Sequence, residues 1–506
     1  MVGLDRRRPA HLPGVLARQA AIRGAFPAVS VGLRAPLTFG EWWHGARTVS
    51  EHLRERVRPG DPVALPFPAE LWPEFCVAYI GCQLAGAIPV PCKARMSPGE
   101  WEALVNGCGV TLVVRPEGST TPLSAAGIPV RHFDDLLRPH PDQLGPATVS
   151  ATAHVLLTSG TTGTPRAVAA SHAELLTGST LPPAWAGTTL VHSLGPATAA
   201  GAEGAMLLAL KSGLHATTVA PVRADDLIGK IADTSARIVL LTPAVAMMCI
   251  QVGLSGRVAD HVKLVMLMGS ATPEWTMQEL VRYFCGGVVM SHYGATEAGS
   301  AQLLMPYDPR RPTAVGRAMG DTEVRIVQDG SLAEPGRAGE VMLRRRSVPQ
   351  RRYASAPAEP ERSAFAEDGW VRTGDLGYLD PNGYLHLLGR QKDIVIRGGQ
   401  NIAPVEVEAA LTAHPDVASA AAFGVPHDLW GEMLVAAVVL RGSNPVGAAD
   451  LRRFVRSRLD AYKVPSRIVL LDSLPCNESG KVRKDVLRVA YLRRDGPDDR
   501  TGELPP

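Results

Sequence analysis

A short segment rich in hydroxyl groups and glycine is the part of the chain best suited to chemistry. It reads Thr158-Ser159-Gly160-Thr161-Thr162-Gly163-Thr164-Pro165-Arg166 and follows a brief apolar run. Hydroxyls, backbone N–H groups and the close backbone approach that glycine permits are what phosphate oxygens require. The Walker pattern G-x-x-x-x-G-K-[ST] is absent from it. We therefore predict a phosphate-binding loop of another class, with an ordinary surface turn as the alternative.

Four further motifs lie C-terminal to this loop. In order, they are Ser291-His292-Tyr293-Gly294-Ala295-Thr296-Glu297, Thr373-Gly374-Asp375-Leu376-Gly377, Gly389-Arg390-Gln391-Lys392-Asp393 continuing to Ile402, and Asn477-Glu478-Ser479-Gly480-Lys481-Val482-Arg483. In this order, the five motifs resemble those of the adenylate-forming superfamily, which contains acyl- and aryl-CoA ligases, peptide-synthetase adenylation domains and luciferases. The resemblance spans about two thirds of the chain and is nearest in pattern to acyl-CoA ligases.

The resemblance implies a two-step reaction. A carboxylate is a poor electrophile because its leaving group would be oxide, whereas AMP is a good leaving group. Such an enzyme activates a carboxylic acid with ATP and Mg²⁺, releases pyrophosphate, and transfers the acyl group to a thiol, here expected to be coenzyme A. Catalysis then depends on positioning and on neutralising phosphate charge.

The resemblance also assigns nucleotide-binding roles. The segment from Thr158 to Gly163 would hold the β- and γ-phosphates, with Arg166 adding charge where family members usually have Lys. Glu297 would bind Mg²⁺. Thr296 would hydrogen-bond the α-phosphate. The remaining expected nucleotide contacts are Tyr293 stacked on adenine, Gly294 beside it, Gly269-Ser270-Ala271 along the base, Asp375 on the ribose hydroxyls, and Arg390 on ribose or phosphate.

Lys481 is the expected catalytic cation. Only eight of the 52 basic residues are lysine, so a Lys between Gly480 and Val482 indicates that a compact ammonium is needed there. By resemblance, it would bridge the acid's carboxylate and the α-phosphate. Thr296 and Glu297 would act with it in catalysis.

The resemblance places the second half-reaction on the C-terminal part of the chain. Lys392 matches the family's hinge residue, about which a small domain rotates between the half-reactions. Gly398 and Gly399 would then line the channel for the thiol.

The acid pocket is expected near Thr198, Thr242, Met247, His292 and Ala295. Many relatives have an aromatic residue or His in the segment corresponding to 194–201, but in this chain residues 195–201 are small and include neither. Three alternatives remain: transfer to a carrier protein in trans or to an amine, activation of another acid such as nitrite, and a nucleotide-binding homologue without catalysis.

The hydrophobic pattern predicts the elements that position these motifs. Between 61 and 290, short apolar runs such as Pro62 to Leu65 and Ile238 to Leu241 alternate with segments of helical length, which indicates α/β layering with a largely parallel sheet. Apolar runs end at Leu157 and Met290, directly before two of the motifs. That arrangement is typical of ligand loops at the carboxyl ends of strands.

The predicted organisation is α/β with two domains. A large N-terminal domain of layered sheets and helices spans 1–389, and a hinge covers 390–392. A small mobile α+β domain spans 393–490, with a helix from Pro404 and strands at 418–423 and 434–440. Residues 491–506 are rich in Asp, Gly, Arg and Pro, so we expect a disordered tail.

Composition limits the possible partners. The chain has 506 residues, 52 basic and 49 acidic, and a net charge of +3, which gives no electrostatic argument for nucleic acid. Seven scattered cysteines without a C-x-x-C pair are typical of reduced thiols, and we expect a cytoplasmic protein. Residues 75–92 carry no charge, but two glycines and two prolines interrupt them. They therefore predict a buried helix and a strand, not a membrane span.

Overall fold

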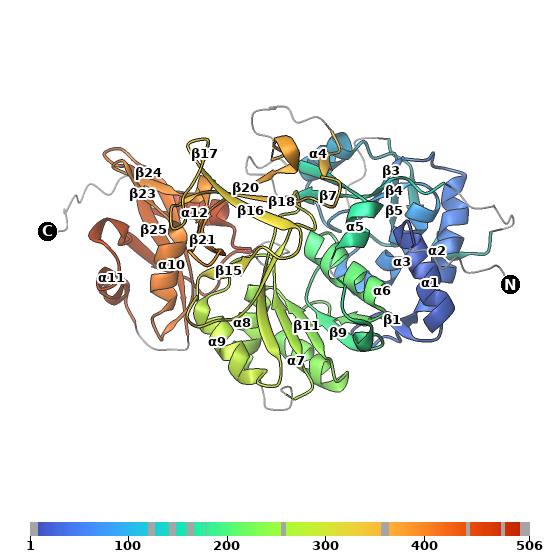
Figure 1. Ribbon diagram of the computed structural model, residues 1–506, viewed down its shortest axis with the longest axis horizontal. Coiled ribbons are helices and arrows are strands. Elements are labelled where there is room, and N and C mark those ends of the chain that lie inside the picture. Colours follow the sequence, from blue (N-terminus) through green and yellow to red (C-terminus); the bar gives the residue numbers. More distant parts are fainter. Residues whose placement is uncertain are drawn as a thin grey trace.

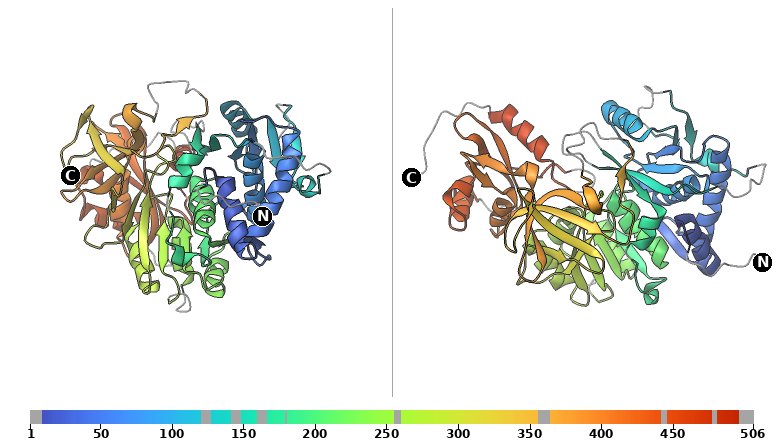
Figure 2. Two further views of the ribbon diagram at one scale, coloured as in Figure 1. Left: turned by 45° about the vertical axis from the view of Figure 1, so that its right-hand side comes forward. Right: turned by 45° about the horizontal axis from the view of Figure 1, so that its top comes forward.

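The computed structural model describes residues 9–119, 127–140, 148–158, 166–178, 180–254, 260–355, 364–441, 446–476 and 481–495. Figure 1 shows a large body and, at one end, a smaller unit formed by the C-terminal segments drawn in orange and red. Figure 2 shows the same division from two other directions. The α/β fold class, with a large and a small domain, is confirmed.

A fourteen-stranded sheet runs through the large domain in the order β17-β16-β18-β20-β21-β15-β14-β13-β12-β11-β9-β10-β1-β2. Its strands are β1 (Pro27–Val31), β2 (Leu37–Thr38), β9 (Thr189–His192), β10 (His215–Thr218), β11 (Ile238–Leu241), β12 (Leu264–Leu267), β13 (Val288–Tyr293), β14 (Leu303–Pro306), β15 (Ala314–Arg317), β16 (Thr322–Gln328), β17 (Ser331–Leu332), β18 (Gly339–Arg345), β20 (Val371–Leu379) and β21 (Tyr384–Arg390).

Only part of this sheet is parallel. The pairings from β1 through β10, β9, β11 and β12 to β13 are parallel. From β13 to β14 onward they are antiparallel. The largely parallel sheet was predicted for residues 61–290, and the strands of the large sheet in that range do pair in parallel. The difference between the two parts is visible in burial: β11 is buried along its whole length, as in a parallel sheet covered on both faces, whereas β20 alternates.

Two smaller sheets complete the large domain. One is parallel and contains β4 (Ile88–Pro91), β3 (Pro62–Leu65), β5 (Leu112–Arg115) and β6 (Val130–His132). The other is antiparallel and contains β19 (Arg352–Tyr353), β8 (Arg166–Ser171) and β7 (Thr152–Thr158).

The second small sheet carries the phosphate-loop segment. Thr158 ends β7 and pairs with Arg166 in the β7–β8 hairpin. The segment therefore follows the carboxyl end of a strand, as expected, but that strand belongs to an antiparallel pair and not to the parallel sheet. Residues 159–165 themselves lie outside the described part of the chain.

Helices cover both faces of these sheets. The α-helices of the large domain are α1 (Leu12–Arg23), α2 (Phe39–Arg54), α3 (Trp72–Leu84), α4 (Pro98–Cys108), α5 (His172–Thr177), α6 (Leu208–Ser212), α7 (Ala224–Asp233), α8 (Pro243–Val252) and α9 (Glu274–Tyr283). A π-helical segment, η4 (Ala200–Leu207), runs directly into α6. Helix α3 followed by β4 confirms the prediction of a buried helix and strand within residues 75–92.

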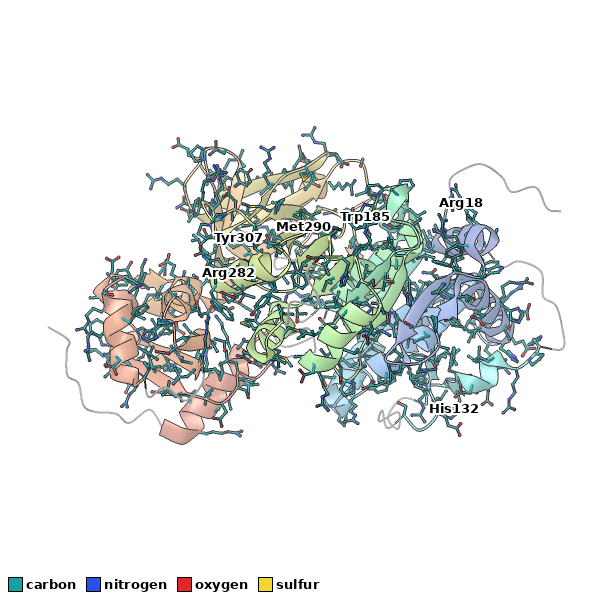
Figure 3. The ribbon with its side chains drawn as sticks, turned by 90° about the horizontal axis from the view of Figure 1, so that it is seen from below. Arg18, His132, Trp185, Arg282, Met290 and Tyr307 are labelled. Carbon is teal, nitrogen blue, oxygen red and sulfur yellow. The ribbon has the colours of Figure 1, made fainter. Side chains whose placement is uncertain are left out.

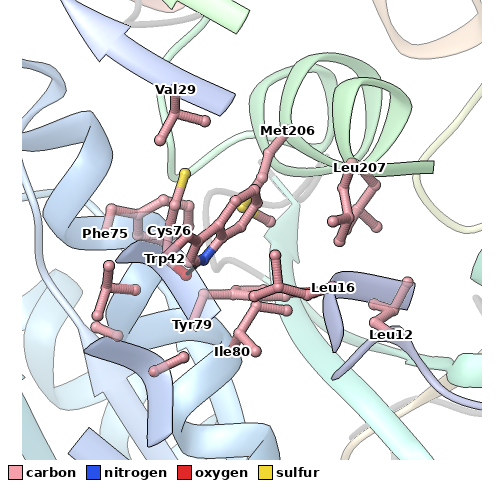
Figure 4. Close-up of a cluster of buried hydrophobic side chains, with 14 of the residues drawn as sticks. Leu12, Leu16, Val29, Trp42, Phe75, Cys76, Tyr79, Ile80, Met206 and Leu207 are labelled. Carbon is pink, nitrogen blue, oxygen red and sulfur yellow. Dashed lines mark hydrogen bonds between the residues drawn. The ribbon is translucent and has the colours of Figure 1, made fainter. Parts of the chain in front are cut away.

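The largest core joins the N-terminal helices to η4. Trp42, Tyr79 and Met206 are completely buried in it, and the Trp42 indole N–H donates to the Cys76 carbonyl oxygen at 2.8 Å (Figure 4). This packing fixes the position of η4 relative to α3.

The small domain is built on a second sheet. Its strands are β22 (Val395–Arg397), β23 (Gln400–Ile402), β24 (Val417–His427), β25 (Gly431–Leu440) and β26 (Arg467–Leu470), and its helices are α10 (Pro404–Thr412), α11 (Ala448–Arg456) and α12 (Lys484–Asp495). The predicted hinge at 390–392 begins at the last residue of β21 and lies before β22, the first strand of the other sheet. Helix α12 extends to Asp495, so the expectation of disorder is wrong for 491–495; residues 496–506 are not described.

The two domains contact each other beside the hinge. The Arg441 guanidinium of the small domain lies 3.9 Å from the centre of the Trp275 ring on α9. Arg441 also donates to the Val417 carbonyl oxygen at 2.9 Å, which fixes its direction. Figure 3 shows the side chains of both domains from below, with Tyr307 and Met290 near the middle of the molecule. Among the described helices, none is long and apolar enough to cross a membrane.

Two glycines should respond oppositely to the same substitution. A Cβ at Gly377 on β20 would lie 2.5 Å from the backbone oxygen of His386 on β21, whereas a Cβ at Gly229 in α7 meets no atom within 4 Å. We expect Gly377→Ala to lower the free energy of unfolding by about 1–3 kcal/mol. We expect Gly229→Ala to raise it by about 0.5–1 kcal/mol. Urea unfolding measures both, and equal effects would contradict the described β20–β21 pairing.

Candidate active site

A cleft of about 2370 Å³ lies between the two domains. The residues expected from the sequence that line it are Thr158, Arg166, Thr198, Met247, Gly269, Ser270, Ala271, His292, Tyr293, Gly294, Ala295, Thr296, Glu297, Asp375, Arg390, Lys392 and Lys481. They come from motifs far apart in the sequence. The fold thus brings one set of candidate residues to one place, although Thr242, Gly398 and Gly399 are not part of its lining.

Asp375 is held at one side of the cleft by two neighbours. The Tyr293 hydroxyl donates to its Oδ2 at 2.7 Å, and Arg390 Nε lies 2.7 Å from Oδ1. The Asp375 backbone N–H donates to Thr373 Oγ1 at 3.1 Å. Burial and the Asp375 carboxylate raise the pKa of the Tyr293 hydroxyl, so it remains a donor. The carboxylate is therefore fixed in direction and faces the cleft.

Glu297 stands next to the phosphate-loop hairpin. Thr158 Oγ1 lies 3.2 Å from Glu297 Oε1, which places the end of β7 beside the loop that follows β13. Arg166, at the start of β8, donates from Nη1 to the Tyr353 hydroxyl at 3.1 Å. The planar guanidinium of Arg166 has several donors, and this contact directs it toward β19.

Lys481 enters the same cleft from the small domain. Burial lowers the pKa of its ammonium group. The nearby cations Arg390 and Lys392 add to this lowering, and the carboxylates of Asp375 and Glu297 oppose it. Lys481 is thus the group of the small domain that shares an electrostatic environment with both carboxylates of the large domain.

Four of the five expected acid-pocket residues line the cleft, and Thr242 does not. Thr198 Oγ1 donates to the Gly195 carbonyl oxygen at 2.8 Å, and Thr242 Oγ1 caps α8 by accepting from Val245 N. The role of Thr242 in binding the acid stays a prediction. Met247, His292 and Ala295 do line the cleft, and burial lowers the pKa of His292, which favours the neutral imidazole.

Gly398 and Gly399 form the turn between β22 and β23. Both have positive φ, +56° and +82°, so a side chain is strained at either position. A Cβ at Gly398 would also lie 2.7 Å from the Trp430 ring. Their role in a thiol channel stays a prediction, because the turn lies away from the cleft in this domain arrangement.

Sequence reasoning missed a buried ionic cluster beside the cleft. Arg351 contacts Glu174 and Glu203, and all three line the cleft. The only sequence signal was Glu203 itself, a carboxylate within a small and apolar segment. Such a residue needs a buried partner, but the partner is 148 positions away.

Comparison with known proteins agrees with this site. Residues 16–351 match the AMP-binding enzyme family, and residues 406–481 match the AMP-binding enzyme C-terminal domain. The chain is 30% identical over 502 residues to 2-succinylbenzoate–CoA ligase of Geobacillus kaustophilus, covering 94% of this chain and 97% of the relative. It is 29% identical over 474 residues to oxalate–CoA ligase of Arabidopsis thaliana, covering 87% and 90%.

A solved structure has the same architecture. The o-succinylbenzoate CoA synthetase from Bacillus subtilis, in complex with its acyl-adenylate intermediate, superimposes with a TM-score of 0.81 at 25% identity, covering 97% of this chain and 99% of that one. The class is therefore that of adenylate-forming enzymes. The chain belongs to the AMP-binding enzyme family and is an AMP-forming acid–thiol ligase.

The Tyr293 hydroxyl offers a test of the site's construction. Tyr293→Phe removes a hydrogen bond to a buried carboxylate, so we expect the free energy of unfolding to fall by about 1.5–3 kcal/mol. Tyr307→Phe is the matched control, because its exposed hydroxyl contacts Glu274 at 3.3 Å. The control should change stability by less than about 0.5 kcal/mol. Equal effects of the two variants in chemical unfolding would contradict the buried Tyr293–Asp375 contact.

Proposed function

We propose that this enzyme joins a carboxylic acid to coenzyme A in two steps, using one cleft and two positions of the small domain. ATP and the acid first form an acyl-adenylate with release of pyrophosphate. The thiol of coenzyme A then attacks the acyl carbon, and AMP leaves. Coenzyme A is chosen as acceptor because the matched relatives are CoA ligases over nearly the whole chain.

The observation that carries the proposal is the position of Lys481 in the cleft. Its ammonium shares the cleft with Asp375 and Glu297, which come from the other domain. A cation here would bind an oxygen of the acid and an oxygen of the α-phosphate together, and so orient the attack. It would also stabilise the charge that develops as pyrophosphate departs.

The remaining cleft residues would bind the nucleotide. Asp375, fixed by Tyr293 and Arg390, would accept from the ribose hydroxyls. Thr296 would donate to the α-phosphate. Asp375 accepts hydrogen bonds, which suits the ribose hydroxyls of AMP, and Thr296 donates one, which suits its phosphate.

Glu297 fits a Mg²⁺ site that the nucleotide completes. Among the described residues, no group of three or more His, Cys, Asp or Glu side chains could hold a metal alone. Mg²⁺ is typically bound by one or two carboxylates plus substrate phosphates and water, which suits a single carboxylate beside the phosphate-loop hairpin. The cation would neutralise phosphate charge, while Glu297 would hold it and Thr158 would orient Glu297.

A panel assay would identify the acid and test the function directly. Pyrophosphate release would be measured with fatty, aryl and amino acids, and with oxalate and 2-succinylbenzoate, which the relatives' names give as their substrates. We expect ATP-dependent release with at least one acid and a thioester of coenzyme A as product. An adenylate that accumulates with coenzyme A but is consumed by a carrier protein or an amine would support the alternative acceptor.

Replacing the Lys481 cation should separate the two half-reactions. We expect Lys481→Ala to slow adenylation by about a thousandfold or more, because its charge is used as pyrophosphate leaves. Thioester formation from supplied acyl-adenylate should change little. Lys484→Ala is the control, since that lysine pairs with Glu408 within the small domain at 2.7 Å. Equal loss in both half-reactions of Lys481→Ala would refute the assigned role.

Removing the Glu297 carboxylate should abolish Mg²⁺-dependent adenylation with little change in melting temperature. Glu297→Gln keeps the shape of the side chain but is a much weaker ligand for a hard cation. Pyrophosphate exchange across a Mg²⁺ titration is the measurement, and Glu323→Gln, on the far side of β18, serves as the control. Unchanged Mg²⁺ dependence would remove Glu297 from the metal site.

A further inference from the structure

Arg351 is completely enclosed between two carboxylates and a backbone carbonyl. Its guanidinium donates to Glu174 Oε2 at 2.9 Å and to Glu203 Oε1 and Oε2 at 2.9 and 2.8 Å. Arg351 Nη1, the atom that donates to Glu203 Oε1, also donates to the Thr296 carbonyl oxygen at 2.9 Å. The side chain of Arg351 is 2% exposed, and that of Glu174 is 3% exposed.

These contacts join four separate parts of the large domain. Glu174 lies on α5, Glu203 on η4, and Arg351 directly before β19. Thr296 belongs to the loop after β13 that carries Glu297. Glu174 reaches this loop a second time, because Ser300 N–H donates to its Oε1 at 2.8 Å.

The loop is also packed tightly against the ion pair. At Gly299, φ is +55°, and a Cβ would lie 2.5 Å from both Arg351 Nε and Glu174 Oε1. Only glycine allows the backbone to approach so closely in this conformation. Two independent observations, the hydrogen bonds and the absence of space, therefore show that the cluster fixes the path of residues 296–300.

The cluster extends into the core behind η4. His154 Nε2 lies 3.1 Å from Glu203 Oε1, and His154 Nδ1 is hydrogen-bonded to the Tyr79 hydroxyl at 2.7 Å. Tyr79 is completely buried on α3. Glu203 thus lies between Arg351 and His154. Burial raises the pKa of its carboxyl, but Arg351 and His154 outweigh this effect and hold the pKa below its usual value.

Stability alone is a weak reason for such a cluster. A buried ion pair loses much of its attraction to desolvation, and apolar residues of equal volume are often as stable. A guanidinium with five directed donors instead gives geometric specificity. That property is useful where a loop must present ligands at fixed positions.

We propose that Arg351 is a positioning residue for adenylation: it fixes the loop carrying Thr296 and Glu297 and couples that loop to η4, which borders the acid side of the cleft. This inference rests on the nucleotide and metal roles assigned above to Thr296 and Glu297. The Arg351 guanidinium donates to groups of the protein itself. It acts through the Thr296 carbonyl and the two carboxylates.

Arg351→Lys is the direct test. Lysine keeps the charge but cannot bond both carboxylates and the carbonyl in one plane. We expect adenylation to slow by about tenfold to a hundredfold, as for a loop displaced by about 1 Å. The KM for MgATP should rise, whereas thioester formation from supplied acyl-adenylate should stay within about twofold, because that step no longer uses the pyrophosphate contacts.

Arg345→Lys is the matched control. Arg345 also pairs with a carboxylate, Asp321 at 2.8 Å, and also donates to a backbone carbonyl, that of Thr177 at 3.2 Å. It makes no described contact with residues 296–300. Its replacement should leave both half-reactions near the parent rate.

Glu203→Gln keeps the test decisive if Arg351→Lys fails to fold. It removes one charge and leaves only one oxygen to accept from Arg351, because the amide NH2 cannot accept a hydrogen bond. We expect the same selective loss, several-fold, in adenylation. The inference is overturned if a folded variant loses both half-reactions equally or loses neither.

Glu297→Gln is measured in the same assays. If Glu297→Gln is fully active, the metal role assigned to Glu297 fails. If Glu297→Gln is inactive but Arg351→Lys is normal, only the positioning role of Arg351 is refuted.

Discussion

The entry of Lys481 into a cleft built by the other domain is the constraint on which the rest of the structure depends. Burial of its ammonium there lowers its pKa, and the neighbouring carboxylates of Asp375 and Glu297 oppose that lowering. The charge is therefore held where an anionic substrate would stabilise it further. The segment between β21 and β22 joins the two domains, and the Arg441–Trp275 contact lies at the same domain boundary.

The large domain supplies a rigid partner for this mobile cation. Asp375 is bonded on both oxygens, and the loop carrying Thr296 and Glu297 is bonded through its backbone to Arg351. Catalysis by positioning requires that ligands do not move when the substrate binds. One domain therefore holds its groups fixed, and the other brings a charge to them. This division fits the proposed two-step reaction, in which Lys481 acts in the first step only.

The sequence predicted which residues form the site better than it predicted which residues hold them in place. The motifs around Glu297, Asp375 and Lys481 carry glycine and charge at fixed spacings, and the fold brings these three residues to one cleft. Helix α10 and strands β24 and β25 were also predicted, because their apolar runs lie between clear turn signals.

Features that depend on long-range pairing could not be predicted. The strand order of the large sheet and the β7–β8 hairpin are set by which strands meet, and a local pattern does not record that choice. Thr242 caps a helix, which its expected place in the pocket did not indicate, since a threonine before a helix fits either role. Arg351 was hidden among many arginines, and its partners lie 177 and 148 positions away.

A structure of the chain with Mg²⁺ and a non-hydrolysable ATP analogue tests the central claim most directly. The account predicts the ribose hydroxyls at about 2.8 Å from Asp375. It also predicts Lys481 on the α-phosphate, Glu297 on the metal, and an unmoved Arg351–Thr296 contact. A nucleotide bound elsewhere, or bound in this cleft with Lys481 in solvent, would contradict it.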